Sequence, residues 1–511
     1  MTLLAALAET SARVSANTAR SVKIRELAIF LKTLPPEEIE TAVLYLSGEL
    51  PQGRIGIGHS TLHAALSKSL NQPPALSISQ VNHDLQVLAG IRGPGSAARR
   101  GQALQELFSR ATLDEQDFLQ RLLQGQIRQG ALGGIMLEAI ASASELPIAS
   151  LRRAAMYSKN VGSVARVALL EGANGLGKFK LEPFVPISPM LAQTAADVAD
   201  ALQQMPGEVA FEWKMDGARI QVHKVGDEIR IYTRNLNEIT HAIPEIAATV
   251  RKFPERVLLL DGEAIVFDTF GRPHPFQTTM RRFGRKLDVE KWQTELPIQA
   301  FFFDCLQFGE HSIVDRPTCE RFQFLTKAVP DSMLIPRLVT SSEPAGRRFY
   351  EAALAAGHEG VMAKSQSAAY EAGNRGASWL KIKRTHTLDL VVLAAEWGHG
   401  RRTGKLSNLH LGALDTATGE YVMLGKTFKG LTDSLLEWQT KEFLAREIHR
   451  DHATVYVRPE LVVEIAFSDL QASSRYPGGI ALRLARVKRY RPDKRTAEAD
   501  TMESVRKVHA S

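Results

Sequence analysis

A proline-rich segment at the end of the first third of the chain constrains the fold more than any other feature. Between Lys178 and Met190 lie Pro183, Pro186 and Pro189. A proline inside a helix removes a backbone hydrogen bond and clashes with the preceding turn, so three in this span exclude a regular helix. The segment therefore predicts a domain boundary, with a different residue pattern on each side.

Residues 1–180 are predicted to be mostly helical. Apolar residues recur at a spacing of three to four in 22–31, 36–46 and 113–123. Thr112 and Asp114 supply capping chemistry at the start of the third segment. The short apolar stretch 3–7 lacks a basic region before it, so no signal peptide is expected.

A glycine-containing pattern occurs twice in this helical part. The segments 46–56 and 123–133 share Leu-x-Gly-x-[Leu/Ile]-x-Gln-Gly-x-[Ile/Leu]-Gly, offset by 77 residues (123 − 46). Glycines let backbone N–H groups approach a ligand closely, and the N-terminus of a following helix favours an anion. The two loops are therefore predicted to grip phosphate backbones. The alternative is that the glycines only permit close helix crossings.

Beyond the proline-rich segment the pattern changes to strands, with turns predicted at 225–227, 261–262 and 270–272. A second change comes near Arg384. Strands are then predicted at 388–396, 409–414, 421–426 and 461–467, with one helix near 433–449. Short strands and glycine turns of this kind favour a small β-barrel. The predicted fold is therefore an all-α domain over 1–182, an α+β domain over 183–385 and a β-barrel over 386–511.

Composition agrees with a soluble multidomain protein. Hydrophobic residues make up 44% of the chain and charged residues 23%, and no apolar run approaches the roughly 18 residues of a membrane span. The net charge of +7 is compatible with a polyanionic partner. Two cysteines, Cys305 and Cys319, exclude a four-cysteine zinc site and are expected to be reduced thiols.

Lys214 is the candidate nucleophile. It follows the apolar run 209–211 and enters the turn Met215-Asp216-Gly217, after which 220–223 alternates as a strand. A lysine held at a strand–turn–strand junction can act as a covalent nucleophile when its surroundings favour the neutral amine. Alone, Lys-x-Asp-Gly is more often a solvated turn, so the rest of the chain decides.

Two glutamates are candidate magnesium ligands. Glu263 lies within the apolar run 258–267, and Glu359 stands beside a glycine in 358–364. A carboxylate in an apolar strand is costly unless it is paired or binds a metal. Together the two could hold Mg²⁺, with waters completing the octahedron. A strand-edge acid and a solvated loop acid are the alternatives.

Aromatic and basic side chains complete the pattern. The strand 300–304 carries three phenylalanines, one of which could stack on a purine. In 379–383, alternation places Lys381 and Lys383 on one face and Leu380 and Ile382 on the other. Two adjacent lysines repel each other and favour an anion between them. Their field would also help to keep Lys214 neutral.

In chain order these motifs resemble the nucleotidyltransferase motifs of ATP-dependent DNA ligases, and they cover nearly the whole chain. The matching segments are Lys-x-Asp-Gly-x-Arg at 214–219, Arg234, Asp-Gly-Glu at 261–263, Phe-Asp at 303–304, Glu-Gly-x-Met-x-Lys at 359–364, Trp-Leu-Lys-x-Lys at 379–383 and Arg-x-Asp-Lys at 491–494. The helical part resembles the DNA-binding domain of the replicative-type members. The pattern as a whole resembles the bacterial three-domain ligases. One departure is Leu484-Ala485, where the family commonly has Phe-Pro.

The resemblance implies a role for each matching residue. Lys214 would attack the α-phosphate of ATP and hold AMP as a phosphoramidate. Glu212 would read the adenine amino group, Arg219 would contact the ribose, and Phe303 would stack on the adenine. The remaining implied residues are Glu263 and Glu359 for metal and ribose, Arg234, Arg375, Lys381 and Lys383 around the phosphates, and Arg491, Asp493 and Lys494 from the C-terminal domain in the adenylylation step.

The resemblance also implies the surroundings of the reaction. The cofactors would be ATP and Mg²⁺, and the substrate would be nicked double-stranded DNA. The C-terminal barrel would be an OB-fold, and the enzyme would be a monomer of the bacterial cytoplasm with no membrane association. The cellular pathway is left open among replication, repair and recombination.

Four other interpretations are weaker. An RNA ligase or an mRNA-capping guanylyltransferase fits poorly with the large helical part and with Glu212. A non-catalytic nucleic-acid clamp would be expected to have lost Lys214 or a metal carboxylate, and all are present. An NAD-dependent ligase resembles a different layout, with a four-cysteine zinc module that two cysteines cannot build.

Overall fold

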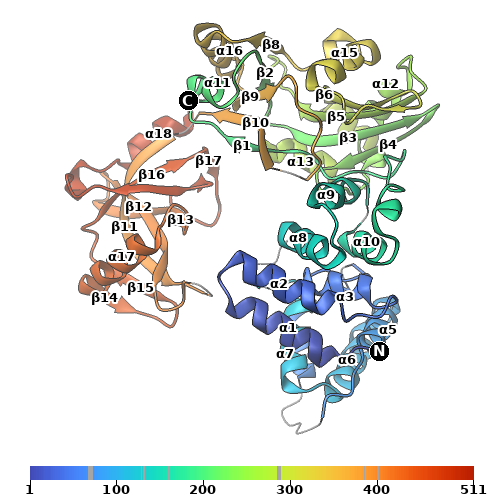
Figure 1. Cartoon of the computed structure of the whole chain (residues 1–511). Coiled ribbons are helices and arrows are strands. Elements are labelled where there is room, and N and C mark those ends of the chain that lie inside the picture. The colour runs from blue at the N-terminus through green and yellow to red at the C-terminus, as the bar shows by residue number, and fades with distance from the viewer. Residues whose placement is uncertain are drawn as a thin grey trace. The chain divides into compact units, whose positions relative to one another are not determined.

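The structure is a computed structural model of the 511-residue chain (Figure 1). It describes residues 1–53, 55–66, 73–127, 129, 133–158, 160–274, 276–284, 289–373, 375–384, 386–399 and 402–510. None of the helices in these ranges is long and apolar enough to cross a membrane. The backbone forms two compact units. One combines Met1–Gln193, Asp216–Ile335 and Ser365–Trp379, and the other combines Thr194–Met215, Pro336–Lys364 and Leu380–Ser511.

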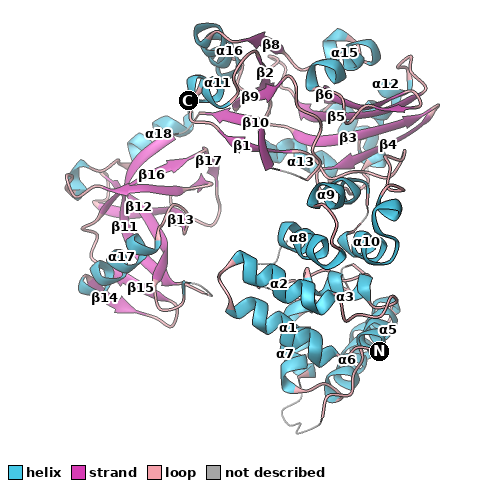
Figure 2. Cartoon of the chain, in the orientation of Figure 1, coloured by secondary structure: helices cyan, strands magenta, loops and turns pink. Residues whose placement is uncertain are grey.

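The N-terminal part is all-α, as predicted, and Figure 2 shows helices joined by loops there, with no strand among the described residues. Its helices are α1 (Leu4–Ala16), α2 (Arg20–Leu31), α3 (Ile39–Leu46), α4 (His59–Ala65), α5 (Ile78–Gly90), α6 (Ser96–Ser109), α7 (Leu113–Leu123), α8 (Gly133–Ser144), α9 (Ile148–Tyr157) and α10 (Val161–Leu176). They share one apolar core that includes Leu7, Phe108 and Phe118. Helix α7 has the predicted bounds, and Thr112 caps it with Glu115 as its reciprocal partner.

The helix predicted over 36–46 begins three residues later, at Ile39. The buried side chain of Glu38 accepts hydrogen bonds from Thr2 N (2.7 Å) and Ser79 Oγ (2.7 Å), which fixes it to the N-terminal segment and to α5. Residues 36–38 are a turn instead, with Glu38 N bonded to Pro35 O.

The two glycine loops follow α3 and α7, and their equivalent glycines adopt the same backbone conformation. Gly48 has φ +77° and Gly125 has φ +64°, in the left-handed region that favours glycine. Buried Gln129 ties the second loop to the core, because Leu46 O and Ser11 Oγ both bond to its side chain. Arg54, Arg128 and 130–132 of the predicted loops lie outside the described residues.

The middle part of the chain is an α+β region with two sheets. The first has the strand order β4 (Glu228–Thr233), β3 (Ala218–Val225), β5 (Val257–Val266), β6 (Ile298–Phe308), β7 (His311–Ser312), and is antiparallel. Helices α12 (Pro244–Arg251), α13 (Phe276–Phe283) and α15 (Thr318–Ala328) share its apolar core. A short helix, α14 (Val289–Glu295), follows α13.

The turn predicted at 261–262 was wrong, because Asp261 and Gly262 lie within β5. Asp261 is buried but paired with Arg219, so its charge is tolerated inside the strand. Gly262 lies so close to β6 that a Cβ would stand 2.7 Å from Phe301 O. An irregularity in the β5–β6 register falls between these two residues. The turns predicted at 225–227 and 270–272 are present.

The second sheet has the order β1 (Leu191–Thr194), β10 (Arg375–Lys383), β9 (Gly360–Ser365), β2 (Val209–Lys214), β8 (Arg337–Thr340). Helices α11 (Val198–Gln204) and α16 (Glu343–Ala355) share a core with Phe211, Val361 and Leu380 on one face of its strands. Because successive side chains alternate, the neighbouring charged residues of β2, β9 and β10 point to the opposite face.

The C-terminal part is an OB-type barrel, as predicted, although the barrel is only partly closed. Its main sheet runs β13 (Glu420–Thr427), β12 (Leu406–Asp415), β11 (His386–Trp397), β15 (Thr454–Val457), β14 (Glu447–Arg450), while β16 (Val462–Phe467) joins β11 to β19 (Arg486–Tyr490). Strands β17 (Asp469–Ala472) and β18 (Ile480–Arg483) form a hairpin, and α18 (Met502–Ala510) follows. The helix predicted near 433–449, α17 (Asp433–Ala445), ends early because Glu447–Arg450 pairs with β15.

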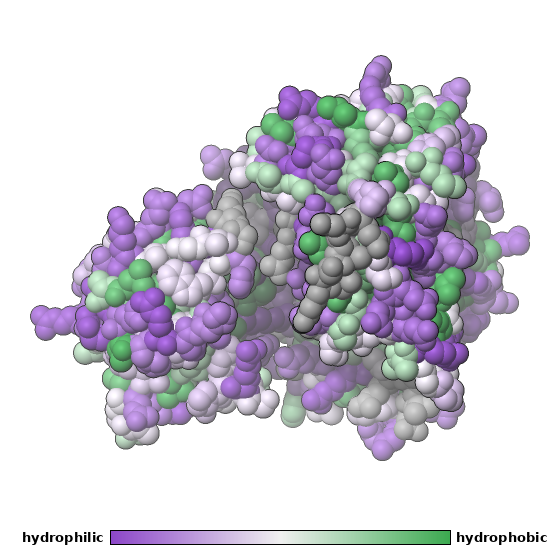
Figure 3. Space-filling model, turned by 90° about the horizontal axis from the view of Figure 1, so that it is seen from below, coloured by the Kyte–Doolittle hydropathy of each residue, from purple (hydrophilic) through white to green (hydrophobic). Residues whose placement is uncertain are grey.

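Figure 3 shows one face of the molecule. Hydrophilic residues cover most of that face, and hydrophobic residues lie on it in small separate groups. Such a face offers polar contacts rather than one broad apolar interface.

Candidate active site

Lys214 ends β2, at the point where the chain leaves the second sheet and enters the first. The strands on either side of the turn belong to different sheets and do not pair with each other. Only glycine fits at position 217 of the motif, because the backbone of β5 lies against it. A Cβ on Gly217 would lie 2.5 Å from Ala264 O and 2.8 Å from the Cγ atom of Glu263. Any larger residue would push the start of β3 away from β5.

A carboxylate joins Lys214 to a second lysine. Glu359 Oε2 lies 2.7 Å from Lys214 Nζ and is also ion-paired to Lys383 Nζ. The backbone reinforces the contact, since Glu359 N donates to Lys214 O at 3.1 Å. Burial opposes ionisation of Glu359, but the charges of Lys214 and Lys383 outweigh it and hold the pKa of Glu359 at about 2. Glu359 is therefore the anion between Lys214 and Lys383, whereas the sequence predicted an anion between Lys381 and Lys383.

The backbone at Gly360 brings this carboxylate against β10. Gly360 has φ +141°, and a Cβ there would lie 2.2 Å from Ile382 O and 3.1 Å from the Cα atom of Lys383. Leu380 and Ile382 are buried, so the face opposite to Lys381 and Lys383 is fixed in the core, as alternation predicted. The position of Glu359 relative to Lys383 thus depends on a residue without a side chain.

We expect Gly360→Ala to impair both folding and reaction with ATP. The conformation and the contact with Ile382 O together predict a loss of about 2–5 kcal/mol of stability, from strain and overpacking. Thermal unfolding and label uptake from α-labelled ATP measure the two effects. Gly90→Ala is the matched control, because the described structure has nothing within 4 Å of the added Cβ there. Unaltered unfolding and label uptake in Gly360→Ala would contradict the steric assignment.

Glu212 is held in a buried ion pair on the charged face of the second sheet. Its side chain is 1% exposed, and its Oε2 lies 2.5 Å from Lys364 Nζ. Arg337 Nη1 from β8 lies 3.6 Å from the other carboxylate oxygen. A buried charge pair of this kind is strongly destabilised when one partner is removed. Lys364 and Arg337 were not assigned from the sequence, although the alternation of β9 places Lys364 on the face of Glu212.

In the other compact unit, Arg219 is fixed by a buried polar network. Its Nε donates to Asp261 Oδ1 at 3.1 Å, its Nη1 donates to Met190 O at 2.6 Å, and its Nη2 donates to the hydroxyl of Tyr370 at 3.2 Å. Tyr370 in turn donates to Asp261 Oδ2 at 2.6 Å. Burial lowers the pKa of Arg219, but the Asp261 charge outweighs it and raises the pKa. Tyr370 was not identified from the sequence.

Two aromatic rings lie close to the same guanidinium. The Arg219 carbon Cζ lies 5.4 Å from the ring centroid of Phe303 and 5.6 Å from that of Trp379. The two rings meet edge to face, with centroids 6.0 Å apart. The structure therefore brings together two of the predicted residues, Arg219 and Phe303, and adds Trp379 to them.

For the other predicted residues of the nucleotide site, the structure gives the strand or turn in which each one lies. Glu263 lies in β5, in register with Arg219 of β3. Arg234 follows β4 in a turn in which Leu236 N donates to Thr233 O. Lys381 lies in β10. Arg375 begins β10, but its side chain lies outside the described residues.

The C-terminal motif is assembled around two carboxylates. Arg491 donates to Asp493 through Nε (3.0 Å) and Nη2 (2.7 Å), so these two predicted residues are paired. Arg491 Nη1 (2.9 Å) and Lys494 Nζ (2.6 Å) both donate to Asp389 Oδ2. Asp389 was missed, although an acid between the apolar residues of 388–392 was a usable signal.

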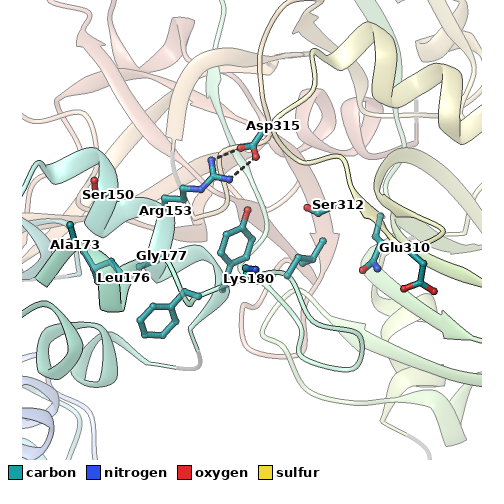
Figure 4. A pocket seen from close by; sticks show the side chains of 14 residues that line it. Ser150, Arg153, Ala173, Leu176, Gly177, Lys180, Glu310, Ser312 and Asp315 are labelled. Carbon is teal, nitrogen blue, oxygen red and sulfur yellow. Dashed lines mark hydrogen bonds and ion pairs between the residues drawn. The ribbon is translucent and has the colours of Figure 1, made fainter. Parts of the chain in front are cut away.

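A separate hollow of about 490 Å³ lies where the helical part meets the first sheet (Figure 4). Arg153 of α9 crosses it and donates to both carboxylate oxygens of Asp315, each at 2.6 Å. Its lining contains none of the predicted site residues: it comprises Ser150, Arg153, Ala154, Tyr157, Ala173, Leu176, Gly177, Phe179, Lys180, Leu181, Gln307, Glu310, Ser312 and Asp315. The hollow is therefore distinct from the candidate active site.

Comparison with known proteins defines the class of enzyme. Three family models match the chain: the DNA ligase N terminus over 67–141, the ATP dependent DNA ligase domain over 189–383 and the ATP dependent DNA ligase C terminal region over 402–494. A solved structure titled Pmar-Lig_PreS3 has the same fold, with a TM-score of 0.65 at 19% identity over 95% of this chain and 99% of that chain.

Relatives of full length agree. A protein named probable DNA ligase from Anaeromyxobacter dehalogenans (strain 2CP-C) is 54% identical over 510 residues, which cover 99% of both chains. A protein of the same name from Sorangium cellulosum (strain So ce56) is 50% identical over 510 residues, covering 99% of this chain and 95% of the relative. The chain belongs to the ATP-dependent DNA ligases. This family seals nicks through an enzyme–lysyl-AMP, and the chain is an enzyme of this kind.

Proposed function

We propose that Lys214 is the residue that carries AMP. The observation behind the proposal is its position at the end of β2, with its ammonium 2.7 Å from Glu359 and with Lys383 on the same carboxylate. In the first step Lys214 loses a proton, and its Nζ bonds to the α-phosphorus of ATP. The bond from that phosphorus to the bridging β-phosphate oxygen breaks, and pyrophosphate leaves with the electron pair. Positioning and charge stabilisation are the protein's contribution to such a displacement.

The remaining steps transfer AMP and then join the DNA ends. AMP passes from Lys214 to the 5′-phosphate of the nick, which gives that phosphate a better leaving group. The 3′-OH then displaces AMP. Around the nucleotide, Glu212 reads the adenine amino group, Phe303 stacks on the adenine, and Arg219 contacts the ribose. Residues proposed near the phosphates are Arg234, Arg375, Lys381 and Lys383.

Mg²⁺ is proposed as the metal, with Glu263 and Glu359 as its protein ligands. Mg²⁺ is commonly held by one or two carboxylates together with substrate phosphates, rather than by a cage of protein ligands. Glu359 fits this role because its lowered pKa keeps it ionised, as a carboxylate ligand of Mg²⁺ must be. The ion would stabilise negative charge on the phosphates.

Two measurements test the proposed function. Incubation with α-labelled ATP should attach label to the protein through a bond that acid breaks, and addition of nicked duplex DNA should then release the label and seal the nick. Labelling without sealing would mean that the acceptor is not a DNA nick. Absence of labelling would remove Lys214 as the carrier.

We propose that residues 1–182 form the DNA-binding domain, 183–385 the adenylation domain and 386–511 the OB-fold domain, and that the enzyme acts as a monomer in the bacterial cytoplasm. The glycine loops of the first domain would contact the phosphate backbones of nicked duplex DNA. Gly53 and Gly125 support this, because no described atom lies within 4 Å of a Cβ built on either. The side on which a Cβ would stand is therefore open to an approaching DNA strand, while the N–H groups of Gly53 and Gly125 donate to Leu50 O (2.9 Å) and Leu122 O (3.0 Å) within their own turns.

We expect Gly53→Asn with Gly125→Asn to weaken binding to nicked duplex DNA and to flatten the salt dependence of binding. Asparagine tolerates the left-handed backbone of both sites (φ +66° and +64°), so the fold should persist while the new side chain obstructs a phosphate. Gly226→Asn is the matched control, with φ +58° and equally open space in the β3–β4 turn. Unchanged affinity and salt slope in the double variant would favour the helix-packing alternative.

A further inference from the structure

Two cations of the C-terminal motif converge on one buried oxygen. Asp389 lies in β11 between the buried residues Leu388 and Leu390, and its side chain is 10% exposed. Its Oδ2 accepts from Arg491 Nη1 at 2.9 Å and from Lys494 Nζ at 2.6 Å. Its Oδ1 is buried and has no hydrogen-bond partner among the described residues. A carboxylate this buried is stabilised chiefly by the two cations that it holds.

The backbone fixes where this carboxylate can lie. Asp389 N donates to Asp500 Oδ2 at 2.8 Å, and Asp500 N donates back to Asp389 O at 2.8 Å. On its other edge, β11 pairs with β16 in a register that sets Asp389 opposite Glu464. Arg491 N is anchored to β16, at Val462 O, 2.9 Å away. The receiving oxygen is therefore part of a rigid sheet rather than of a loop.

The second carboxylate of the motif has a different environment. Asp493 is 59% exposed and bonds Arg491 but not Lys494, whose ammonium, within the described ranges, donates to Asp389 alone. Water and salt weaken an exposed pair, whereas a buried pair keeps its geometry. Lys494 and Arg491 repel each other, so a shared oxygen between them is needed to keep the two charges close.

We propose that Asp389 is a positioning residue for the first step of the reaction: it holds Arg491 and Lys494 side by side so that both meet the departing pyrophosphate. The inference rests on the proposed role of the C-terminal motif in adenylylation. Asp389 engages one of the three N–H donors of Lys494, so the ammonium is oriented and keeps donors for an oxyanion. Asp389 touches neither substrate nor reacting atoms and acts through the two cations.

The test separates the steps in the full-length enzyme. Asp389→Ala should lower the single-turnover rate of self-adenylylation by about tenfold or more, with a smaller change in KM for ATP, since the cations act on charge that develops as pyrophosphate leaves. Sealing of a nick that already carries AMP should stay within about twofold of wild type, since pyrophosphate has no part in it. Asp389→Asn, which keeps one acceptor oxygen, should recover part of the rate.

Glu464→Ala is the matched control. Glu464 lies opposite Asp389 on β16 and also holds an arginine and a lysine, Arg489 (2.7 Å) and Lys488 (3.6 Å). It forms no ion pair with Arg491 or Lys494 within the described ranges, and its charge raises the pKa of Arg491 less than the charges of Asp389 and Asp493 do. Its self-adenylylation should match wild type. In addition, Asp389→Ala should lower the rate of self-adenylylation less in a Lys494→Ala background than in the wild-type enzyme, because Lys494, one of the two cations that Asp389 positions, is already absent.

The outcomes are distinguishable. A wild-type rate in Asp389→Ala, in an enzyme that does label itself, overturns the positioning role and leaves the proposed function standing. Equal losses in both steps, with a lowered thermal unfolding midpoint, also overturn it and make Asp389 a structural residue. Failure of the wild-type enzyme to label itself refutes the proposed function first.

Discussion

Lys214→Ala will take up no AMP from α-labelled ATP, and its overall nick sealing from ATP will fall by at least about 10³-fold, because no other side chain can take over the covalent step. Lys383 is paired with the same carboxylate, Glu359, but it lies on a different strand, β10. Lys214→Arg will behave in the same way, since a guanidinium keeps its proton and is a poor nucleophile. Gel-resolved label on the protein measures the first effect, and sealing of a nicked duplex measures the second.

The fold should survive the loss of Lys214. Glu359 keeps its ion pair with Lys383, so no buried charge is left without a partner, and the stability change should stay within about 2 kcal/mol. Lys381→Ala is the comparison: it removes a lysine proposed to lie near the phosphates, from the face of β10 that carries Lys383, so it should slow label uptake without abolishing it. Acid-labile, lysine-linked AMP on the Lys214→Ala protein would refute the assignment.

Motif order and residue spacing predict most of the architecture. Helical spacing gives the bounds of α7, because its apolar stripe and its Thr112 cap are both local features. Alternation in 379–383 predicts the buried and charged faces of β10 for the same reason. The turn predicted at 261–262 fails because Asp-Gly is a turn signal only when nothing else pairs the aspartate. Here Arg219, 42 residues away, supplies that pairing.

Partners from distant strands account for what the sequence leaves out. Glu212 and Lys364 lie on neighbouring strands that only the sheet order brings together, so the ion pair has no local signal. Tyr370 lies in the segment between β9 and β10 and donates a hydrogen bond to Asp261, 109 residues earlier in the sequence. Asp389 and Lys494 are 105 residues apart. Each case is a buried polar group whose partner is set by tertiary packing.

The same reasoning decides which carboxylate orders the C-terminal cations. The sequence favours Asp493, which stands inside the Arg-x-Asp-Lys motif. In the described structure Asp493 is bonded to Arg491 only. Lys494 is bonded instead to Asp389, which lies on β11, 105 residues earlier in the chain. A surface pair two residues apart is worth little in water, so the motif alone does not hold the cations together. Asp389, which is fixed in its sheet, holds the two cations together.

Lys494→Ala should therefore block the first step and spare the last. The lysine is proposed to meet the β- and γ-phosphates as they depart, so self-adenylylation should fall by about 10²-fold, the size of effect seen when one donor to a developing charge is removed. Sealing of a nick that already carries AMP should remain near wild type, because pyrophosphate has left before that step begins. The domain that carries Lys494 is thus needed early, and we propose that it changes position before DNA is sealed.

Asp493→Ala extends the test to the exposed partner. It removes every bond from Arg491 to Asp493 but leaves the bond from Arg491 to Asp389, so its loss of adenylylation should be smaller than that of Lys494→Ala. Rates of label uptake and of sealing, measured for both variants beside wild type, give the comparison. Equal losses in the two assays would point to damaged folding or DNA binding. Wild-type rates in both assays would make Arg-x-Asp-Lys a surface ion pair with no part in the chemistry, because a group that orients the leaving phosphates must slow their departure when it is removed.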